Sequence, residues 1–485
     1  MIDRMGGGLL QLATPRSNFD EYLTVNPDIS FYQYVYKKHT NFAMESKLHD
    51  FINVPQLSPI SSGSGMYRCN IDLSGDIDLI NEMYLSFSLP EIYSSEKYKF
   101  RWIKNVGTVF LKSAKVYIDG MMIDQLTGEW MHIWNELSAP QGDTRFDTLV
   151  GNAPELQDPK LSLPRVAIKN NRFFYFYYPE GTPEKPSINS RRIVLPLKFW
   201  FTKSPALSLP IFRFAVNGMM THTLTVEVEL YSSERLYQVY SEKMNMYVSP
   251  EFYNQLHNDN INIYTFTKSS PIDITPNIEV NTVTLSDEER AYLFNKQSLS
   301  YLVEQLTINA PVGMISTSDI SKDINIQVNN PTKELIWVVK RNDLDKFNDF
   351  SNYSADIPES NTGILQSATI KFNNNSRIQE KNAEYFSMIQ PYQFHTKIPK
   401  AGIYSYSFSL HPEKEFLAGY YNASMIRTIL NVKLKQNNND YINHKMVQNG
   451  LQPYQFDYIV NVYAINYNIF EMISSTPGLK FTVST

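Results

Sequence analysis

Apolar and polar residues alternate in several stretches of the chain, which is the period of a half-buried β-strand. Three such stretches occur in the first half, at residues 84–89, 109–118 and 223–230. Three more occur in the second half, at residues 336–339, 403–410 and 459–465. Asp119-Gly120 and Asn217-Gly218 each separate two apolar runs, and both dipeptides readily adopt the positive φ angles of a hairpin turn. The pattern therefore predicts an all-β protein.

Two segments have a helical pattern instead. Residues 128–137 follow Thr127, a suitable N-cap, and their apolar side chains fall on one helical face. That face consists of Trp130, Ile133, Trp134 and Leu137. Ser286, followed three residues later by Glu289, is a capping-box pattern that opens a helix through Phe294. We predict that both helices lie in loops between strands, and that the tryptophans of the first pack on a sheet of the first half.

The two halves of the chain share a weak internal repeat. Residues 113–120 (SAKVYIDG) match 367–374 (SATIKFNN), and residues 84–89 (YLSFSL) match 334–339 (ELIWVV). A third pair of segments, beginning with LPLKFWF and GIYSYSF, follows in the same order. A period this long indicates two tandem domains rather than a solenoid.

This repeat suggests a division into four parts: an N-terminal arm at 1–26, a first domain at 27–232, a linker or insertion at 233–275 and a second domain at 276–485. Irregular strand spacing and about 200 residues per half favour two tandem eight-stranded antiparallel jelly rolls with short helices in their loops. The arm contains three consecutive glycines and little periodicity, so we predict that it does not fold within the first jelly roll.

Composition narrows the classes of function. The chain of 485 residues has a formal net charge of -5, which disfavours a dedicated nucleic-acid binder because phosphate affinity depends on clustered Lys and Arg. Lys37 and Lys38 follow Tyr32, Tyr34 and Tyr36, but so few charges release few counterions, and a solvated strand end is the simpler interpretation. A single cysteine excludes an intramolecular disulfide framework and a Cys-rich metal site, which fits a reducing, cytoplasm-like compartment.

No residue pattern indicates an active site. The eight histidines form no HxH or HExxH motif and are scattered at His39, His49, His132, His222, His257, His395, His411 and His444. Cys69 is interpreted as a buried small hydrophobe, since a catalytic thiol needs a positioned base. Gly6-Gly7-Gly8 lacks the Gly-Lys-Ser/Thr of a phosphate-binding loop, and Asp287, Glu288 and Glu289 suit a helix N-terminus. We therefore predict no catalytic, cofactor-binding or metal-binding residue, and no enzyme.

A collinear series of segments resembles the major capsid proteins of nucleocytoplasmic large DNA viruses. In the first half these segments are residues 5–14 (MGGGLLQLAT), 22–46, 117–137 (YIDGMMIDQLTGEWMHIWNEL), 150–156 (VGNAPEL) and 195–210 (LPLKFWFTKSPALSLP). The remaining segments are residues 285–294, 301–306, 329–337, 385–393, 401–412 and 460–470. The resemblance covers nearly the whole chain with its order preserved.

The resemblance implies a double jelly roll that forms homotrimers, each a pseudo-hexagonal capsomer in an icosahedral shell. Three chains with two similar domains each give six similar lobes, which suits a lattice with six neighbours per unit. It also implies contacts with neighbouring capsomers, with minor capsid proteins and, through the N-terminal arm, with an inner membrane, but no direct contact with nucleic acid. The expected location is the capsid of the virion, after assembly in the host cytoplasm.

Two alternatives remain open. A minor capsid paralogue has the same fold, and residues 233–275 are longer than the corresponding connection in many relatives. A carbohydrate-binding jelly-roll protein, from another functional class, fits the 32 Tyr and 5 Trp but gives no account of the collinear segments.

Two segments have more apolar and aromatic residues than isolated sandwiches need, residues 195–212 and 385–394. The prolines of the first limit its pairing within a sheet. We therefore predict that Leu207 and Leu209 contact a neighbouring chain or domain, and that Phe199 and similar strand positions fill the core of their own domain.

Overall fold

The computed structural model of the chain describes residue 26 and residues 39–52, 64–71, 77–94, 98–158, 186–216, 219–267, 274–315, 320–435, 441–448, 452–453, 455–473 and 476–481. The chain divides into two units, Met1–Asn41 and Phe42–Thr485. Nearly all of the first unit lies outside the described residues, and so do the glycines at 6–8 and the Lys37-Lys38 pair. What was predicted for these segments stays a prediction.

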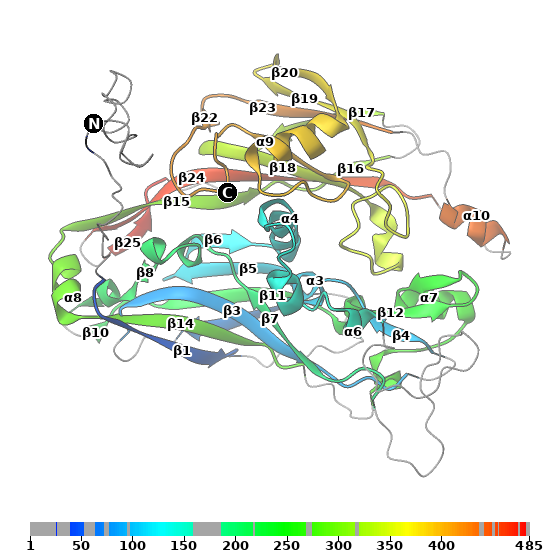
Figure 1. Ribbon diagram of the computed structural model, residues 1–485, viewed down its shortest axis with the longest axis horizontal. Helices are drawn as coiled ribbons and strands as arrows, with labels where there is room; N and C mark the ends of the chain where they lie inside the picture. Colours follow the sequence, from blue (N-terminus) through cyan, green and yellow to red (C-terminus); the bar gives the residue numbers. More distant parts are fainter. Residues whose placement is uncertain are drawn as a thin grey trace, which may run out of the picture. The chain divides into compact units, whose positions relative to one another are not determined.

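The first half of the larger unit folds into two antiparallel sheets (Figure 1). One has the order β1-β14-β3-β7, with a short β8 on β3; these strands are β1 (Phe42–Asp50), β14 (Asn277–Leu285), β3 (Leu79–Leu89), β7 (Arg191–Pro196) and β8 (Leu209–Pro210). The other has the order β2-β11-β5-β6, formed by β2 (Ser64–Ile71), β11 (Leu224–Tyr231), β5 (Leu111–Ile118) and β6 (Met121–Leu126). Two four-stranded antiparallel sheets with these crossovers make a jelly roll.

The second half repeats this arrangement. Its larger sheet has the order β15-β24-β18-β21, formed by β15 (Ser298–Ile308), β24 (Tyr458–Ile473), β18 (Pro331–Arg341) and β21 (Ile403–Ser407). Three short strands extend it, β16 (Val312–Met314), β22 (Tyr421–Asn422) and β25 (Thr476–Leu479). The facing sheet has the order β17-β23-β19-β20, formed by β17 (Ser321–Ile326), β23 (Thr428–Leu434), β19 (Leu365–Phe372) and β20 (Asn375–Asn382). The predicted fold class, an all-β double jelly roll, is confirmed.

The segments matched in the internal repeat fall on equivalent strands. β3 and β18 hold the same place in the first sheet of each jelly roll, as do β7 and β21. β5 and β19 correspond in the second sheet, and so do β11 and β23. The weak sequence repeat therefore reflects a repeat of topology.

The border between the two jelly rolls differs from the predicted one at residue 276. That division assigns Asn277–Leu285 to the second domain, whereas this strand is β14 and pairs with β1 on one side and with β3 on the other. It supplies the strand that completes the first sheet. By sheet membership the first jelly roll extends to Leu285, and the second begins with β15.

Residues 233–275, predicted as a linker or insertion, are folded where the structure describes them. The elements are η6 (Ser233–Leu236), β12 (Tyr237–Ser241), β13 (Met246–Val248), α7 (Pro250–His257) and η7 (Ile263–Thr265). β12 pairs with β13 and with β4 (Phe100–Trp102) of the first jelly roll. The rings of Tyr237 and Phe100 stack with centroids 5.0 Å apart. The insertion is thus anchored on the first domain by a small sheet and an aromatic cluster.

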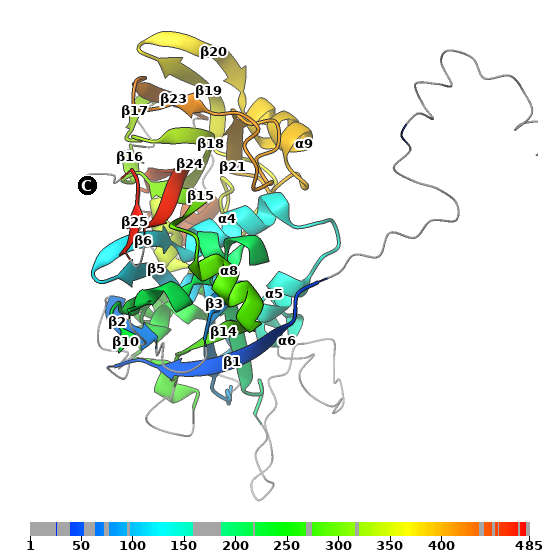
Figure 2. The same ribbon diagram turned by 90° about the vertical axis from the view of Figure 1, so that its left-hand side faces the viewer.

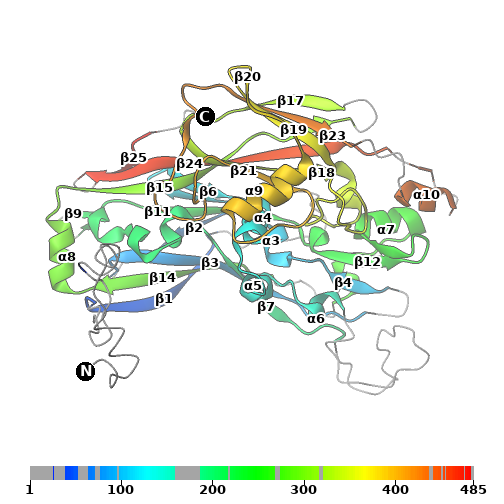
Figure 3. The same cartoon turned by 45° about the horizontal axis from the view of Figure 1, so that its top comes forward.

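Most loops contain short helices or small hairpins, visible from two further directions in Figures 2 and 3. In the first half these are α3 (Val106–Phe110), α4 (Gly128–Ser138), α5 (Arg145–Leu149), α6 (Pro154–Gln157), η3 (Trp200–Thr202), η4 (Pro205–Leu207), η5 (Ile211–Phe214), β9 (Ala215–Val216) and β10 (Met219–Met220). The others are α8 (Asp287–Phe294), η8 (Asn342–Lys346), the π-helix η9 (Tyr385–Ile389), α9 (Gln390–Phe394) and α10 (Tyr441–Gln448).

Local sequence signals give these turns and helices their positions. Asp119 and Gly120 have φ angles of 49° and 83° and join β5 to β6, which confirms the hairpin. The side chain of Thr127 accepts a hydrogen bond from the Trp130 N–H at 3.1 Å, which confirms the cap of α4. β9 and β10 pair around Asn217-Gly218, two residues that lie outside the described ones. α8 begins after Ser286 as predicted, but the Ser286 side chain makes no capping hydrogen bond.

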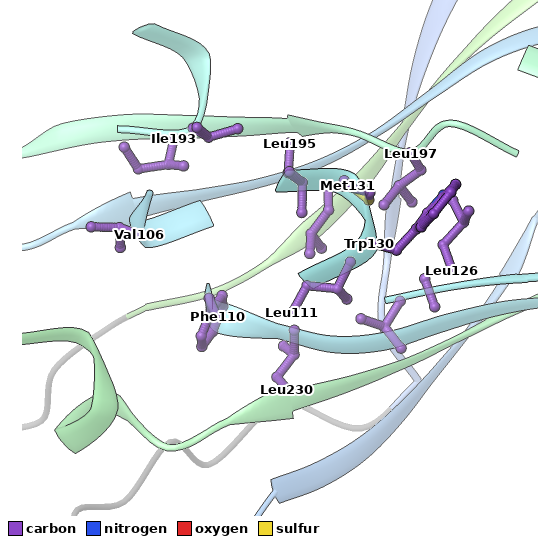
Figure 4. Packing of buried hydrophobic residues seen from close by; sticks show 14 of the residues in the cluster. Val106, Phe110, Leu111, Leu126, Trp130, Met131, Ile193, Leu195, Leu197 and Leu230 are labelled. Atoms are coloured by element: carbon purple, nitrogen blue, oxygen red, sulfur yellow. The ribbon is translucent and has the colours of Figure 1, made fainter. Parts of the chain in front are cut away.

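Helix α4 completes the core of the first jelly roll. Trp130 and Met131 are buried with Leu126 of β6 and with Leu195 and Leu197 at the end of β7 (Figure 4). Trp134, on the same helical face, is only half-buried. Both tryptophans therefore pack on this core as predicted, but only Trp130 is buried, and full burial of Trp134 is not observed.

Candidate assembly surfaces and the junction between the jelly rolls

The first turn of α4 connects the two jelly rolls through Glu129. Its carboxylate accepts hydrogen bonds from Lys340 of β18 at 2.8 Å, and from Asn461 and Tyr463 of β24 at 2.8 and 2.9 Å. Burial pushes the pKa of Glu129 upward, but the Lys340 ammonium and the neutral donors more than offset this and leave the pKa below its ordinary value. Glu129 is therefore ionised and holds α4 on the second domain.

A second charged group crosses the junction. The Glu304 carboxylate of β15 forms ion pairs with two lysines. Lys203, which follows η3 in the first jelly roll, lies 3.0 Å from it, and Lys333 of β18 is the other partner. The Lys333 ammonium also donates to the Lys414 carbonyl at 2.8 Å. Burial opposes ionisation of Glu304, but the two lysines keep its pKa below the ordinary value. A buried charge of this kind is tolerated only because it is paired on both sides.

His395, which follows α9, fixes a third set of contacts within the second jelly roll. Its side chain is fully buried and its ring nitrogens contact Glu334 at 2.6 Å and Glu413 at 3.1 Å. Burial alone lowers the pKa of His395, but the two carboxylates outweigh it and raise the pKa to about 9. The imidazolium therefore ties the end of α9 to β18 and to the loop between β21 and β23.

Apolar side chains are exposed on the segment that His395 anchors. Met388 and Ile389 of η9 and Tyr392 of α9 point to solvent, and Tyr392 is 78% exposed. Phe386, one turn earlier, is fully buried and holds the helix on the second jelly roll. α9 lies beside β21 (Figure 3). We call Met388, Ile389 and Tyr392 the α9 surface.

The loop between β21 and β23 has a similar composition. Its exposed apolar residues are Leu410, Phe416, Leu417, Tyr420 and Met425. Glu413 of this loop accepts from the Thr396 N–H at 2.9 Å as well as contacting His395. The residues that follow α9 are thus joined to this loop by hydrogen bonds. The α9 surface and the loop both expose apolar side chains of the kind that protein interfaces bury.

The apolar segment at 195–212 fills its own domain. Phe199 and Phe201 are fully buried in the first core, as predicted, and Trp200 between them is fully buried as well. Leu209 is also fully buried and pairs with Ile80 through β8 and β3. The prediction that Leu209 contacts a neighbouring chain or domain is therefore wrong, because a two-residue strand forms despite the flanking prolines.

Leu207 lies beside that strand and is half-buried on the same core. It offers less apolar surface to a partner than the predicted segment 385–394 does, since Tyr392 is largely exposed.

Cys69 and the acidic run at 287–289 lie on separate elements. Cys69 is fully buried in β2, and burial raises the pKa of its thiol to about 12. Asp287, Glu288 and Glu289 form the first turn of α8. Among the described residues, no group of three or more His, Cys, Asp or Glu side chains is placed to hold a metal ion. None of the described helices has the length and hydropathy that crossing a membrane requires.

The charged contacts at the junction were not predicted from the sequence. Glu129 and Asn461 lie 332 residues apart, and Lys203 and Glu304 lie 101 apart. Such pairs have no local spacing signal. The α9 surface, by contrast, could be recognised in the sequence, because segment 385–394 is richer in apolar residues than the core of its own domain requires.

Comparison with known proteins assigns the family. Residues 30–265 match the family described as "Major capsid protein N-terminus", and residues 289–478 match "Large eukaryotic DNA virus major capsid protein". The chain is 26% identical to the major capsid protein of Phaeocystis pouchetii virus, over 99% of this chain and 100% of that one. It is 25% identical to the major capsid protein of Paramecium bursaria Chlorella virus 1, over 98% and 100% of the two chains. It is 24% identical to "Probable capsid protein 4" of Acanthamoeba polyphaga mimivirus, over 98% and 99%.

Solved structures show the same fold. A chain of the PBCV-1 virus capsid superposes with a TM-score of 0.66 at 21% identity, covering 94% of this chain and 100% of that one. The Faustovirus major capsid protein superposes with a TM-score of 0.61 at 10% identity, covering 94% of each. With two family models that together span both jelly rolls and full-length relatives in several viruses, the chain belongs to the family of major capsid proteins of large eukaryotic DNA viruses.

Proposed function

We propose that this chain is a structural virion protein that assembles as homotrimers, each a pseudo-hexagonal capsomer of an icosahedral capsid. Family membership supports the capsid role, and the two equivalent jelly rolls support the geometry. Three copies of a two-lobed chain present six similar lobes around a threefold axis, and one heterologous contact used three times closes the ring. No step of this function requires an active site.

The observation that carries the proposal is the α9 surface. Tyr392, Met388 and Ile389 are exposed while their helix is held in place by the buried Phe386 and His395. A pre-organised apolar surface costs little conformational entropy when a partner covers it. We propose that a second copy of the chain covers it in the trimer.

Light scattering after size-exclusion chromatography tests this proposal. A trimer has three times 56.1 kDa, about 168 kDa. Tyr392→Asp places a charge at the centre of the α9 surface, and we expect monomers of unchanged circular dichroism because the side chain is not part of a core. Val447→Asp on α10 is the matched control, since Val447 is also an exposed apolar helical residue. Intact trimers from Tyr392→Asp would remove the α9 surface from the interface, and a wild-type monomer would refute the trimer itself.

A second candidate, a minor capsid paralogue, is favoured by one finding. Two different capsid proteins of Acanthamoeba polyphaga mimivirus, "Probable capsid protein 4" and "Capsid protein 1", both match this chain. Quantitative mass spectrometry of purified virions separates the two roles, because a principal shell protein is the most abundant and a paralogue is not. A carbohydrate-binding protein, the remaining alternative, would be a monomer that binds glycans.

The cellular partners follow from the same proposal. The chain would assemble in the host cytoplasm, contact neighbouring capsomers and minor capsid proteins, and reach an inner membrane through residues 1–26, without contacting nucleic acid. Cross-linking of intact virions followed by mass spectrometry measures these contacts directly.

A further inference from the structure

Strand β1 forms an edge of the first jelly roll that has no partner strand in the described part of the chain. It is the terminal strand of its sheet, where it pairs with β14 on one side (Figure 2). Such an edge offers a row of backbone N–H and C=O groups to any extended chain, and proteins usually protect it. β1 is nine residues long, so its free side can accept a whole strand.

An edge strand of the second jelly roll shows the usual protection. β20 also ends its sheet, but its exposed residues are all polar, and Arg377 and Glu380 are among them. β1 instead exposes three large apolar side chains, since Phe42, Met44 and Leu48 are 55%, 54% and 59% exposed. These three lie an even number of residues apart and therefore share one face of the strand. β1 thus presents the apolar, accessible edge that a partner strand covers.

The sequence of β1 is complementary to itself. When two copies run antiparallel with Ser46 opposite Ser46, Met44 of each strand faces Leu48 of the other. Glu45 then faces Lys47 on the other surface of the pair. Neither charged side chain has a hydrogen bond or an ion pair within the described part of the chain. Directly opposed apolar side chains and opposite charges are the pairs that stabilise antiparallel strands.

Charge also selects this register over its neighbours. Centring the pair on Glu45 would set Glu45 against Glu45, and centring it on Lys47 would set two lysines against each other. Like charges directly opposite each other destabilise an antiparallel pair. The sequence of β1 therefore favours one alignment, with a two-fold axis at Ser46.

We propose that β1 is a docking edge for β1 of a second copy of this chain, with the two strands antiparallel about a two-fold axis at Ser46. The β1-β14-β3-β7 sheets of the two copies then continue into each other through backbone hydrogen bonds. The contact is isologous, because both partners use the same surface. It does not depend on the trimer proposed above, and where trimers form it connects one trimer to the next.

Cysteine cross-linking of the purified full-length protein tests this register. Ser46→Cys places two thiols opposite each other on paired strands, at a Cα separation that a disulfide spans. We expect mild oxidation to give a disulfide-linked dimer of two times 56.1 kDa, about 112 kDa, on a non-reducing gel. Phe42→Cys is the control, because residue 42 opposes residue 50 and its two copies lie about 26 Å apart. The native thiol of Cys69 is fully buried.

A charge exchange distinguishes the proposed contact from random collision. In the Ser46→Cys background, Glu45→Lys or Lys47→Glu alone opposes like charges and should slow cross-linking by about fivefold at low salt. The two changes together restore opposite charges and should recover the rate. Arg377→Glu on β20 alters the net charge as Lys47→Glu does and should leave the rate unchanged.

The outcomes separate this contact from the trimer. Lack of a Ser46→Cys dimer, or a double charge variant that stays slow, would overturn the proposal. Protection of the β1 amides from hydrogen exchange without a cross-link would show that a different segment covers the edge, which would overturn it as well. Light scattering on the same samples reports the trimer independently, so trimers that do not cross-link would refute the β1 contact alone, and cross-linked monomers would refute the trimer alone.

Discussion

Replacing Trp130 by Ala should destabilise the protein more than any other single change in α4. The side chain is 7% exposed and is buried with Leu126, Met131 and Leu197 in the core of the first jelly roll (Figure 4). Its ring also packs on Tyr463 of the second jelly roll, with centroids 5.4 Å apart. Removal of a buried tryptophan typically costs about 3–5 kcal/mol, because the cavity left behind does not collapse fully.

Trp134 provides the internal comparison, since it lies on the same face of the same helix but is half-buried. Its ring contacts are with Trp130 at 5.5 Å and with His395 at 6.1 Å. Aromatic pairs contribute about 0.5–1.5 kcal/mol each beyond the area that they bury. Because Trp134 buries less of its surface than Trp130, Trp134→Ala should cost less than Trp130→Ala. Helical periodicity alone treats the two tryptophans as equivalent and therefore does not predict this difference.

Urea unfolding followed by far-ultraviolet circular dichroism measures the difference. Because two domains need not unfold together, the midpoint of the first transition is compared between variants under one set of conditions. Trp130→Phe, which keeps an aromatic ring against Tyr463, should recover most of the loss. A Trp134→Ala midpoint as low as that of Trp130→Ala would refute the burial argument, and so would a Trp130→Ala midpoint equal to that of the wild type.

Three further expectations concern other parts of the molecule. The pKa of His395 in the folded protein is about 9, raised above its ordinary value of 6.5 by Glu334 and Glu413. Its stabilising pairs with these carboxylates should persist below pH 6.5 and be lost as pH rises through 9, and His395→Gln should flatten that part of the wild-type stability profile. Cys69, buried and with its pKa raised to about 12, should react with a thiol reagent far more slowly in the native protein than in urea; equal rates would contradict its burial. Deletion of residues 1–20 should leave soluble trimers but impair shell assembly, and loss of folding in the truncated protein would contradict an independent arm.

Local signals predicted the local structure. Asp119-Gly120 specifies its hairpin because the turn requires two positive φ angles and these residues supply them. Thr127 specifies the start of α4 because its hydroxyl satisfies a backbone N–H three residues on. Alternation identified the equivalent strands of both jelly rolls. Each of these features depends on residues that are neighbours in sequence.

Pairings between distant segments could not be predicted in the same way. The predicted border placed β14 in the second half, because the apolar pattern of a strand does not indicate which strands it pairs with. In the structure, Val280 of β14 pairs with Lys47 of β1 and with Met83 of β3. The capping hydrogen bond predicted for Ser286 does not form, for a related reason. Arg290 of α8 forms an ion pair with the buried Asp78 at 2.8 Å, and this tertiary contact rather than a local cap fixes the start of α8.

The contacts of α4 explain why the two jelly rolls can act as one building block. Glu129 fastens the start of the helix to β18 and β24, and the Leu137 carbonyl near its end accepts the Lys397 N–H at 3.0 Å. Lys397 follows α9 closely, so the same helix that completes the first core also restrains the chain that presents the α9 surface. A single ion pair on a protein surface would be worth little, but contacts at both ends of a buried helix resist rotation of one domain against the other. In the proposed trimer, the angle between the two lobes of each chain would therefore be set within the chain before any neighbour binds.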